Sequence, residues 1–241
     1  MKIDERCEML TIGLLGGMSW ESTLTYYQAI NQGVKAKLGG LHSAKIAMLS
    51  IDFAELEKMQ IEENWSAQAE FLVNAALKVE AAGADFLLIC TNTMHKVAND
   101  VQAAISIPIL HIADATAEGL RAAGIQKVAL LGTAYTMEQN FYKGRLVNNH
   151  GLEVLVPNQH DRSIVHDVIY QELCAGQVLP KSKQEFLRIV SSLANQGAEG
   201  IILGCTEIGL LLNQQDTEVR LFDTTLIHAQ AAVERAVKQS N

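Results

Sequence analysis

Two similar tetrapeptides recur along this chain, Ala82-Gly83-Ala84-Asp85 and Gln196-Gly197-Ala198-Glu199, and each is followed at once by an apolar run. Gly197 lies 114 residues after Gly83. A second pair, Leu15-Gly16-Gly17 and Leu131-Gly132-Thr133, repeats at a spacing of 116 residues. Solenoids repeat at about 20 to 50 residues, so this long period predicts two related halves instead. A site between such halves would receive matching residues from each.

Apolar runs of strand length alternate with longer amphipathic segments. The runs are continuously apolar, which predicts strands buried on both faces of a parallel sheet. The expected strands are Leu10–Leu15, Lys45–Ser50, Phe86–Cys90, Ile107–Ile112, Val128–Leu131, Glu153–Val156, Ile201–Leu203 and Arg220–Phe222. Spacing of i, i+3, i+4 predicts helices over Asn64–Ala82, Arg162–Leu173 and Lys183–Gln196. Strand followed by helix, repeated, indicates the α/β class.

Composition narrows the classes of function. The 241 residues are 49% hydrophobic, which is enough for a substantial core, and their net charge is −8. Because the chain has no cluster of Lys and Arg, we expect no nucleic-acid partner. The apolar runs are far shorter than the about 20 residues that cross a bilayer, so we expect no membrane segment. The opening residues 2–8 lack an apolar signal sequence, which predicts a cytoplasmic protein.

The cysteines do not form a disulfide or metal pattern. Cys7, Cys90, Cys174 and Cys205 are widely spaced and lack a C-x-x-C pair, which favours reduced thiols. Cys7 lies in a charged leader and is interpreted as incidental. No group of His, Cys and Asp has the spacing of metal ligands, so we expect no metal.

The repeat also shows which residues of the two halves are equivalent, when positions are counted from Gly83 and from Gly197. Cys205 comes eight residues after Gly197, and Thr91 comes eight residues after Gly83, whereas Cys90 is one residue short. Successive side chains of a strand point to opposite faces, so a shift of one residue reverses the direction of a group. Thr91 is therefore the expected counterpart of Cys205. Cys90 is the weaker candidate, and burial in the core is its simpler interpretation.

Three stretches of the chain resemble the signatures of one enzyme family. They are Gly13-Leu14-Leu15-Gly16-Gly17-Met18, Asn92-Thr93-Met94-His95 and Gly204-Cys205-Thr206-Glu207. They resemble stretches of the aspartate/glutamate racemase family, and the similarity extends over nearly everything from Leu10 onward. Members of that family have two pseudo-symmetric α/β halves, use no pyridoxal phosphate, and place two cysteines on either side of the substrate α-carbon. The family usually reads Cys-Asn-Thr where this chain reads Thr91-Asn92-Thr93.

The resemblance implies a fold, an assembly and a cofactor requirement. It implies two pseudo-symmetric Rossmann-like lobes, each a mainly parallel sheet flanked by helices, with the active site at the lobe interface. The expected lobes are residues 10–113 plus 224–241, and residues 114–223. A homodimer, a small-molecule amino-acid substrate and no cofactor are also implied.

The substitution at Thr91 predicts unequal chemistry on the two faces of the substrate. A free thiol has a pKa of about 8.5, which cations or helix N-termini can lower, whereas an alcohol is much harder to ionise. We expect Cys205 to be the base, and Thr91 to relay a proton on the opposite face, itself or through water. In the family the second-half cysteine acts on the L form, so the resemblance implies an L-biased racemase, close to the branch with Thr in place of the first cysteine.

The remaining candidates would bind the substrate. Asn92, Thr93 and Thr206 would donate to the α-carboxylate, whose charge grows as the carbanion forms. Glu207 would pair with the ammonium group. By resemblance, Gly17, Met18 and Ser19 line the cleft, and Gln60 is a polar contact on the loop after the second strand.

The sequence leaves the choice of substrate open. A cation is expected against the distal carboxylate of an acidic substrate, yet the segment 170–174 supplies none, and Cys174 stands at that place. An aspartate/glutamate enzyme and a broad-specificity racemase of neutral amino acids are therefore both retained. Other superfamily chemistries, such as hydantoin racemisation, maleate isomerisation or decarboxylation, are further alternatives. An amino-acid-binding regulatory protein on the same scaffold is the non-enzymatic one. His95 is interpreted as a cap or packing residue.

Overall fold

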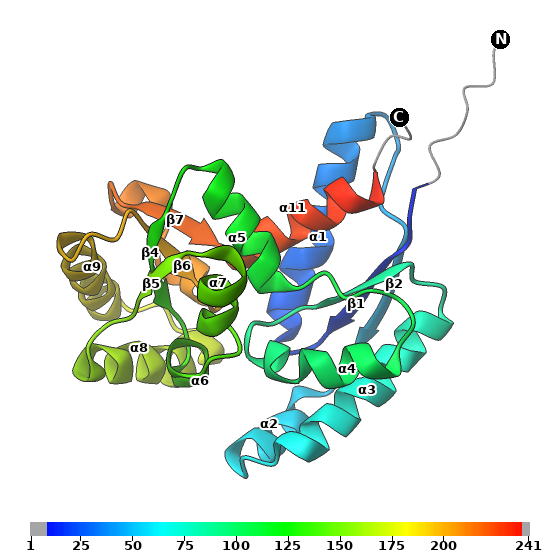
Figure 1. The fold of residues 1–241 in the computed structure, drawn as a ribbon, viewed down its shortest axis with the longest axis horizontal. Helices are drawn as coiled ribbons and strands as arrows, with labels where there is room; N and C mark the ends of the chain where they lie inside the picture. Colours follow the sequence, from blue (N-terminus) through cyan, green and yellow to red (C-terminus); the bar gives the residue numbers. More distant parts are fainter. Residues whose placement is uncertain (1–8, 238–241) are drawn as a thin grey trace. The chain divides into compact units, whose positions relative to one another are not determined.

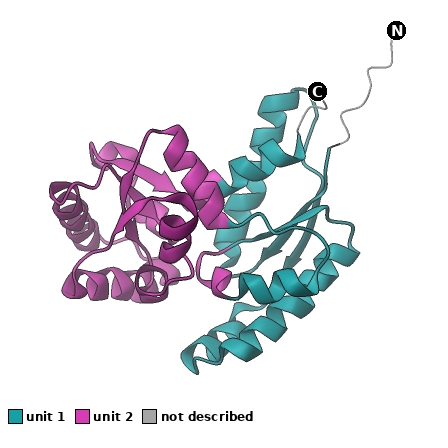
Figure 2. Ribbon diagram, viewed as in Figure 1, with its two compact units in different colours: residues 1–90, 97–111, 228–241 teal, residues 91–96, 112–227 magenta. Residues whose placement is uncertain are grey.

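The computed structural model describes residues 9–237, so Cys7 lies outside the described part. Contacts divide the chain into two compact units, shown in Figure 2. Unit 1 holds the residues up to Cys90, Val97–His111 and the residues from His228 onward, and unit 2 holds Thr91–Lys96 and Ile112–Ile227. The lobes expected from the sequence, with boundaries after Ala113 and Asp223, stay a prediction beside this division.

Unit 1 is built on a parallel sheet with the strand order β2-β1-β3 (Figure 1). Its strands are β1 (Ile12–Gly16), β2 (Ile46–Ser50) and β3 (Phe86–Ile89). Its helices are α1 (Trp20–Leu38), α2 (Phe53–Ile61), α3 (Trp65–Ala81) and α4 (Ala98–Ala104), together with most of α11 (Thr224–Ala236). The central strand β1 is buried along its whole length, as expected for a strand between two layers of helices.

The core of unit 1 is formed by α1 and α11 on one face of this sheet, with α3 on the other. Helix α1 contributes Tyr26, Ile30 and Val34, which are four residues apart and therefore share one face. The Ser19 side chain caps this helix by accepting a hydrogen bond from Ser22 N. The helices thereby bury the sheet and leave the carboxyl ends of its strands for the loops.

Unit 2 repeats the plan with one more strand. Its parallel sheet has the order β5-β4-β6-β7, and these strands are β4 (Lys127–Leu131), β5 (Glu153–Leu155), β6 (Gly200–Leu203) and β7 (Arg220–Asp223). Its α-helices are α5 (Ile112–Ala122), α6 (Ala134–Glu138), α7 (Lys143–His150), α8 (Gln159–Gln171), α9 (Pro180–Asn195) and α10 (Ile208–Leu211). Short 3-10 helices are η1 (Thr93–Val97), η2 (Leu173–Ala175) and η3 (Gln214–Asp216).

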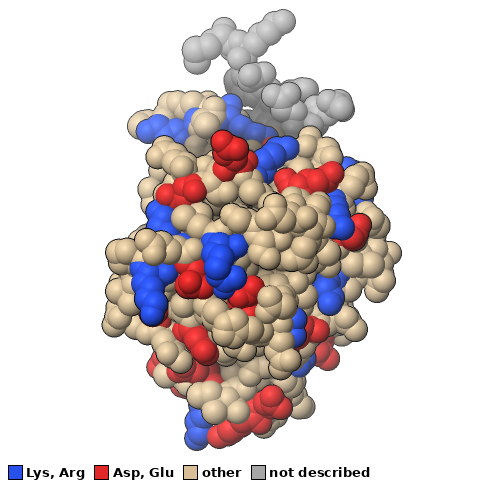
Figure 3. All heavy atoms as spheres, turned by 90° about the vertical axis from the view of Figure 1, so that its left-hand side faces the viewer, with Lys and Arg blue, Asp and Glu red and all other residues tan. Residues whose placement is uncertain are grey.

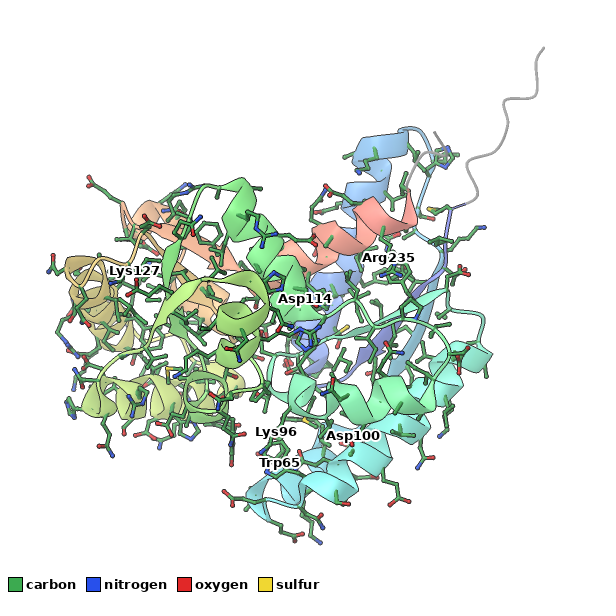
Figure 4. All side chains as sticks on the ribbon, in the orientation of Figure 1. Trp65, Lys96, Asp100, Asp114, Lys127 and Arg235 are labelled. Carbon is green, nitrogen blue, oxygen red and sulfur yellow. The ribbon has the colours of Figure 1, made fainter. Side chains whose placement is uncertain are left out.

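Polar contacts on the outer surfaces supplement these cores. Asp114 on α5, labelled in Figure 4, accepts two hydrogen bonds of 2.7 Å from Arg145 on α7 and pairs with His150 at 2.8 Å. Arg235, also labelled there, places its guanidinium 4.8 Å from the Phe86 ring centre. Acidic and basic side chains are interspersed over the face drawn in Figure 3.

The prediction of an α/β fold with two parallel sheets flanked by helices is confirmed. Seven of the eight expected strands and all three expected helices form, with boundaries shifted by a few residues. The largest shifts are at the starts of α8 and α9, which each begin three residues early. Helix α8 begins at Gln159 because the Asn158 side chain caps it by accepting from Asp161 N.

The eighth expected strand, Ile107–Ile112, was wrong. Its only pairing with the sheet is an isolated bridge between Ile109 and Leu87, and Ile112 opens α5. Leu110 N donates to Leu87 O at 2.9 Å, but of the neighbouring donors on that side Pro108 has no N–H and Ile112 N donates to His95 Nε2 at 3.2 Å. The backbone donors that a longer strand needs are therefore missing or committed elsewhere.

Within residues 9–237, no helix combines the length and the apolar character needed to cross a membrane.

Candidate active site

The carboxyl ends of β3 and β6 make equivalent backbone hydrogen bonds, each within its own sheet. Cys90 N donates to Leu15 O at 2.9 Å in unit 1, and Gly204 N donates to Leu131 O at 2.6 Å in unit 2. In the sheet register Leu15 faces Ile89, just as Leu131 faces Leu203. The internal geometry of each unit therefore makes Cys90 the equivalent of Gly204, and the next residue, Thr91, the equivalent of Cys205.

The acidic residue before each of these strands bonds to the backbone of the neighbouring strand through both its side chain and its own N–H group. The Asp85 carboxylate accepts from Thr11 N at 2.6 Å, and the Glu199 carboxylate accepts from Lys127 N at 3.0 Å. Their own N–H groups donate back to the carbonyls of Thr11 and Lys127 at 2.9 and 2.8 Å. The tetrapeptides that revealed the repeat thus have one physical role, which is to fix the register of β1 with β3 and of β4 with β6.

Cys90 belongs to the core of unit 1. Its side chain is fully buried among α1, α11 and the sheet, and its Sγ lies 3.9 Å from Leu88 O. Burial raises the pKa of this thiol far above its ordinary value. A thiol in this position packs as a small apolar side chain and is not available as a base.

Cys205 follows β6 and lies at the margin of the core of unit 2, where it is partly exposed. Its thiol donates a hydrogen bond of 2.9 Å to Glu207 Oε2, and the Thr206 hydroxyl donates to the same oxygen at 2.7 Å. Glu207 Oε2 therefore accepts a hydrogen bond from the side chain of each of the two preceding residues.

The pKa of the Cys205 thiol is raised well above its ordinary value in this arrangement. Desolvation is the largest cause, followed by the charge of Glu207 and by the hydrogen bond that the thiol donates to it, and the nearby Cys174 adds to the effect. From the sequence, a cation or a helix N-terminus could have lowered this pKa. The group that contacts the thiol is instead a carboxylate, which disfavours the thiolate.

Asn92 is anchored to the end of β6 through Thr224. The Thr224 hydroxyl donates to Leu203 O at 2.9 Å and therefore accepts the hydrogen bond that Asn92 Nδ2 donates at 3.0 Å. This order fixes the orientation of the Asn92 amide. Its Oδ1 is buried and has no hydrogen-bond partner among the described residues, so it is an acceptor held ready for a donor.

The residues around Asn92 turn directly into η1. Thr91 is partly exposed, and Thr93 is the first residue of η1 and is buried. Thr91, Asn92 and Thr93 all belong to unit 2, together with Cys205, Thr206 and Glu207. The structure thus brings both predicted groups of active-site residues into one compact unit, although β3, which precedes Thr91, belongs to unit 1.

Cys174 is exposed and lies on η2, which packs against α10. An electrostatic interaction with Cys174 contributes to the raised pKa of Cys205. Cys174 is therefore the candidate specificity residue that belongs to the same unit as Cys205.

The other four candidates belong to unit 1. Gly17 N donates to Thr23 Oγ1 at 2.7 Å, Met18 is buried, and Ser19 caps α1. Gln60 was expected on a loop but lies buried near the end of α2, because the Asp52 side chain caps a helix that continues to Ile61. The part of these residues in substrate binding stays a prediction.

Two residues of this site were not identified from the sequence. Thr224 anchors Asn92 from 132 positions away, and no spacing or motif near it indicates that contact. His95 was expected to cap or pack, and it is buried with its ring bonded to backbone groups, but the sequence did not identify Thr91 as its partner. The four-residue spacing between Thr91 and His95 is the only signal that could have suggested it. Among the described residues, no three His, Cys, Asp or Glu side chains gather as a metal site.

Known proteins similar to this chain share its length and architecture. A family model for Asp/Glu/hydantoin racemases matches residues 15–232. A crystal structure of a proposed Asp/Glu racemase from Yersinia pestis is 54% identical, with a TM-score of 0.91, and the match covers 95% of this chain and 100% of that one. An aspartate racemase homologue from Pyrococcus horikoshii OT3 is 37% identical, with a TM-score of 0.83 and coverages of 95% and 100%. The broad-specificity amino-acid racemase RacX from Bacillus subtilis is 26% identical over 165 residues, which are 67% of this chain and 69% of that protein.

Proposed function

Because this chain belongs to the Asp/Glu/hydantoin racemase family, we propose that it is a cofactor-independent amino-acid racemase in which Cys205 removes the α-proton and Thr91 serves the opposite face. The family supports amino-acid racemisation, and the division of labour between a thiol and an alcohol is inferred from Cys205 and Thr91 of this chain. The reaction should therefore start more readily from the L-amino acid.

The observation that carries the proposal is the hydrogen bond between Cys205 and Glu207. At 2.9 Å the carboxylate holds the thiol and controls its acidity, and the thiol proton passes to solvent when the thiolate forms. With no further charge present, the anion opposes that ionisation, as the raised pKa of Cys205 indicates. A positive charge beside Glu207 would reverse the effect.

The substrate itself brings that positive charge. An amino acid carries an ammonium group, which we propose is bound by the Glu207 carboxylate and by Asn92 Oδ1, the buried acceptor without a partner. Pairing with the ammonium lowers the negative potential at Cys205 and favours its thiolate. The base is thereby activated only when an amino acid is bound.

The α-carbanion is stabilised through the substrate carboxylate. Deprotonation spreads negative charge onto that group, so donors aimed at it bind more tightly in the transition state. We propose that the backbone amides of Thr93 and Thr206 and the Thr93 hydroxyl are these donors, because the Thr206 hydroxyl already donates to Glu207. A proton from the Thr91 hydroxyl, or from a water that it holds, then reaches the opposite face of the carbanion and completes the inversion.

Aspartate and glutamate are the first substrates to test, with neutral amino acids as the second candidate class. The absence of a cation between Tyr170 and Cys174 favours neutral side chains, and the similarity to RacX, a broad-specificity racemase, points the same way. The stronger similarity to the proposed Asp/Glu racemase from Yersinia pestis favours acidic ones. We further propose a cytoplasmic homodimer, which gel filtration would contradict by showing only monomer.

The test is proton NMR in D₂O without added cofactor. The α-proton signal is followed separately for the L and D forms of aspartate, glutamate and several neutral amino acids, and chiral chromatography measures inversion. We expect faster loss of the signal from the L form. In Cys205→Ala that loss should slow by about 10²- to 10⁴-fold, which is the usual contribution of a general base.

Each alternative has its own outcome in this experiment. Turnover confined to acidic substrates removes the broad-specificity interpretation. Stereospecific binding without exchange of any α-proton would identify an amino-acid-binding protein and contradict the proposal. Unchanged exchange in Cys205→Ala would contradict the assignment of the base.

A further inference from the structure

Helix α1 carries large apolar side chains on a face that is exposed to solvent. Trp20, Leu24 and Tyr27 are 64%, 55% and 48% exposed. They lie at positions i, i+4 and i+7, so they line one face of the helix. Tyr26 and Ile30 lie on a different face and are buried in the core of unit 1. The helix therefore has a second apolar face besides the one that packs on the sheet.

Contacts on the two flanks of α1 show where this exposed face is directed. Helix α11 packs on one flank, where a Cβ added to Gly33 would lie 2.9 Å from a methyl group of Val233 (Figure 1). On the other flank, the Asn31 side chain accepts a hydrogen bond of 3.0 Å from Ala44 N, two residues before β2. Asn31 lies four residues after Tyr27 and so continues the exposed face. That face is therefore on the flank of α1 that borders β2, away from α11.

Strand β2, at the edge of the sheet, extends this apolar surface. In the sheet register Met48 pairs with Leu14, whose side chain lies in the core that α1 covers. Paired residues of neighbouring strands point to the same face, so Met48 lies on the α1 side of the sheet, and it is exposed. Leu38, eleven residues after Tyr27, continues the exposed face to the end of α1. We call these residues the α1 patch: Trp20, Leu24, Tyr27, Leu38 and Met48. An exposed apolar patch of this kind marks an interaction site.

A row of exposed polar residues beside the patch carries opposite charges at its two ends. Glu21, Gln28 and Lys35 lie seven residues apart, which is about two turns, so they form a straight row along α1. Glu21 and Lys35 are equally far from Gln28. A second α1 helix, antiparallel to the first about a twofold axis at Gln28, brings each Glu21 level with Lys35 of the partner subunit. A parallel pair would place like charges opposite each other. The row is therefore complementary to its own antiparallel copy.

Resting on the homodimer of the proposed function, we propose that the α1 patch binds a second copy of this chain, with the two α1 helices antiparallel about a twofold axis near Gln28. Trp20 of each copy then lies close to the level of Leu38 of the partner subunit, and Tyr27 lies near the axis. Apolar side chains bury each other at the centre, and the pairs of Glu21 and Lys35 beside them fix the orientation. This assembly depends on neither the substrate nor the chemistry of Cys205.

The first test is sedimentation velocity of the full chain over a range of concentrations at low salt, which measures the Kd of the dimer. Leu24→Arg places a charge within the patch, and we expect it to raise Kd by about 100-fold. Leu77→Arg is the matched control, because Leu77 is an exposed apolar residue of α3 outside the patch. We expect its Kd to stay within about twofold of wild type. Circular dichroism establishes that both variants are folded.

The second test exchanges the charges of the row. Glu21→Lys and Lys35→Glu each place like charges opposite each other twice in the dimer, and we expect each to raise Kd by about tenfold. The variant with both substitutions restores opposite charges in exchanged positions, so its Kd should return to within about threefold of wild type. Two unrelated folding defects would not cancel in this way.

The outcomes separate the assembly, its interface and the chemistry. A wild-type protein that is monomeric at every concentration would overturn this proposal together with the homodimer. A dimer that persists equally in Leu24→Arg would overturn the α1 patch as the interface and leave the homodimer in place. Absence of rescue in the double variant would overturn the antiparallel arrangement. Exchange of α-protons in D₂O, measured on the same samples, shows separately whether the racemase chemistry fails.

Discussion

The ends of β3 and β6 have matching backbones and different chemistry. Each strand ends with one N–H donated to the neighbouring strand, from Cys90 in one unit and from Gly204 in the other. The thiol of the first end is fully buried, whereas that of the second, at Cys205, comes one position later and contacts a carboxylate. One residue of displacement thus separates a core cysteine from a candidate base. Position relative to the last ladder bond, and not residue type, decides which it is.

The comparison extends two residues further. Glu207 lies at the repeat position of Thr93, so only the β6 end has an anion beside its reactive group. An anion both raises the pKa of the thiol and attracts an ammonium group. The two ends therefore differ in the side chain at the repeat position, a thiol or an alcohol, and in the charge beside it, which is what the proposed enzyme with unequal faces requires.

Removal of the Thr91 hydroxyl, which follows β3, should give the largest change in the rate of inversion among the following variants. In Thr91→Ala we expect inversion to slow by about 10²-fold, because one face loses its proton donor. Deuterium wash-in from the L form should remain, because it depends on Cys205. Both rates come from one D₂O experiment with chiral separation. Cys90→Ala is the matched control, and loss of activity there but not in Thr91→Ala would reverse the assignment of the two residues.

A thiol at both repeat positions should make the chemistry on the two faces of the substrate more alike. In Thr91→Cys a thiol stands at both repeat positions, and a thiol ionises far more readily than an alcohol. We expect α-proton loss from the D form to rise by about tenfold, so that the bias toward the L form narrows. The ratio of initial rates from the two enantiomers measures this. A ratio equal to that of the wild type would show that residue 91 does not face the substrate.

Removing the anion at the β6 end should change the thiol in a defined direction. Glu207 raises the pKa of Cys205, so Glu207→Gln should lower that pKa and increase the thiolate fraction at any pH below it. At pH 8 we expect alkylation of Cys205 by iodoacetamide to be about three- to tenfold faster, followed by mass spectrometry of the peptide that contains it. KM should rise, because the substrate ammonium loses its partner. Slower alkylation would show that Glu207 favours the thiolate.

The smallest effect on catalysis should come from the glycines that end β1 and β4. A Cβ on Gly16 would lie 2.6 Å from Thr23 Oγ1, an atom that cannot retreat because it bonds Gly17 N and Ser19 O. A Cβ on Gly132 would lie 3.1 Å from its nearest neighbour, Gly204 O. We expect Gly16→Ala to lower the free energy of unfolding by about 1–3 kcal/mol and Gly132→Ala by less. Urea denaturation measures both, and equal losses would contradict the difference in packing.

The sequence was most informative where a pattern repeats. The spacing of Gly83 and Gly197 identified both halves and the equivalence of Thr91 with Cys205, because strand register depends on local backbone bonds that the repeat preserves. The strand expected at Ile107–Ile112 was wrong, because Pro108 has no N–H and the side chain of His95 accepts the hydrogen bond of Ile112 N. The link from Asn92 to Thr224 and the raised pKa of Cys205 depend on contacts that form only in three dimensions, so no local pattern could indicate them.

The division of the chain into units has a consequence for protein engineering. The backbone passes from one unit to the other after Cys90, Lys96, His111 and Ile227. Neither unit is therefore encoded by a single continuous stretch, and no fragment made by cutting the chain once consists of one unit alone. To express unit 2 alone, one would have to graft the hexapeptide Thr91–Lys96 onto residues 112–227 through a new linker. A simple truncation at the start of α5 would leave Asn92 and His95 behind.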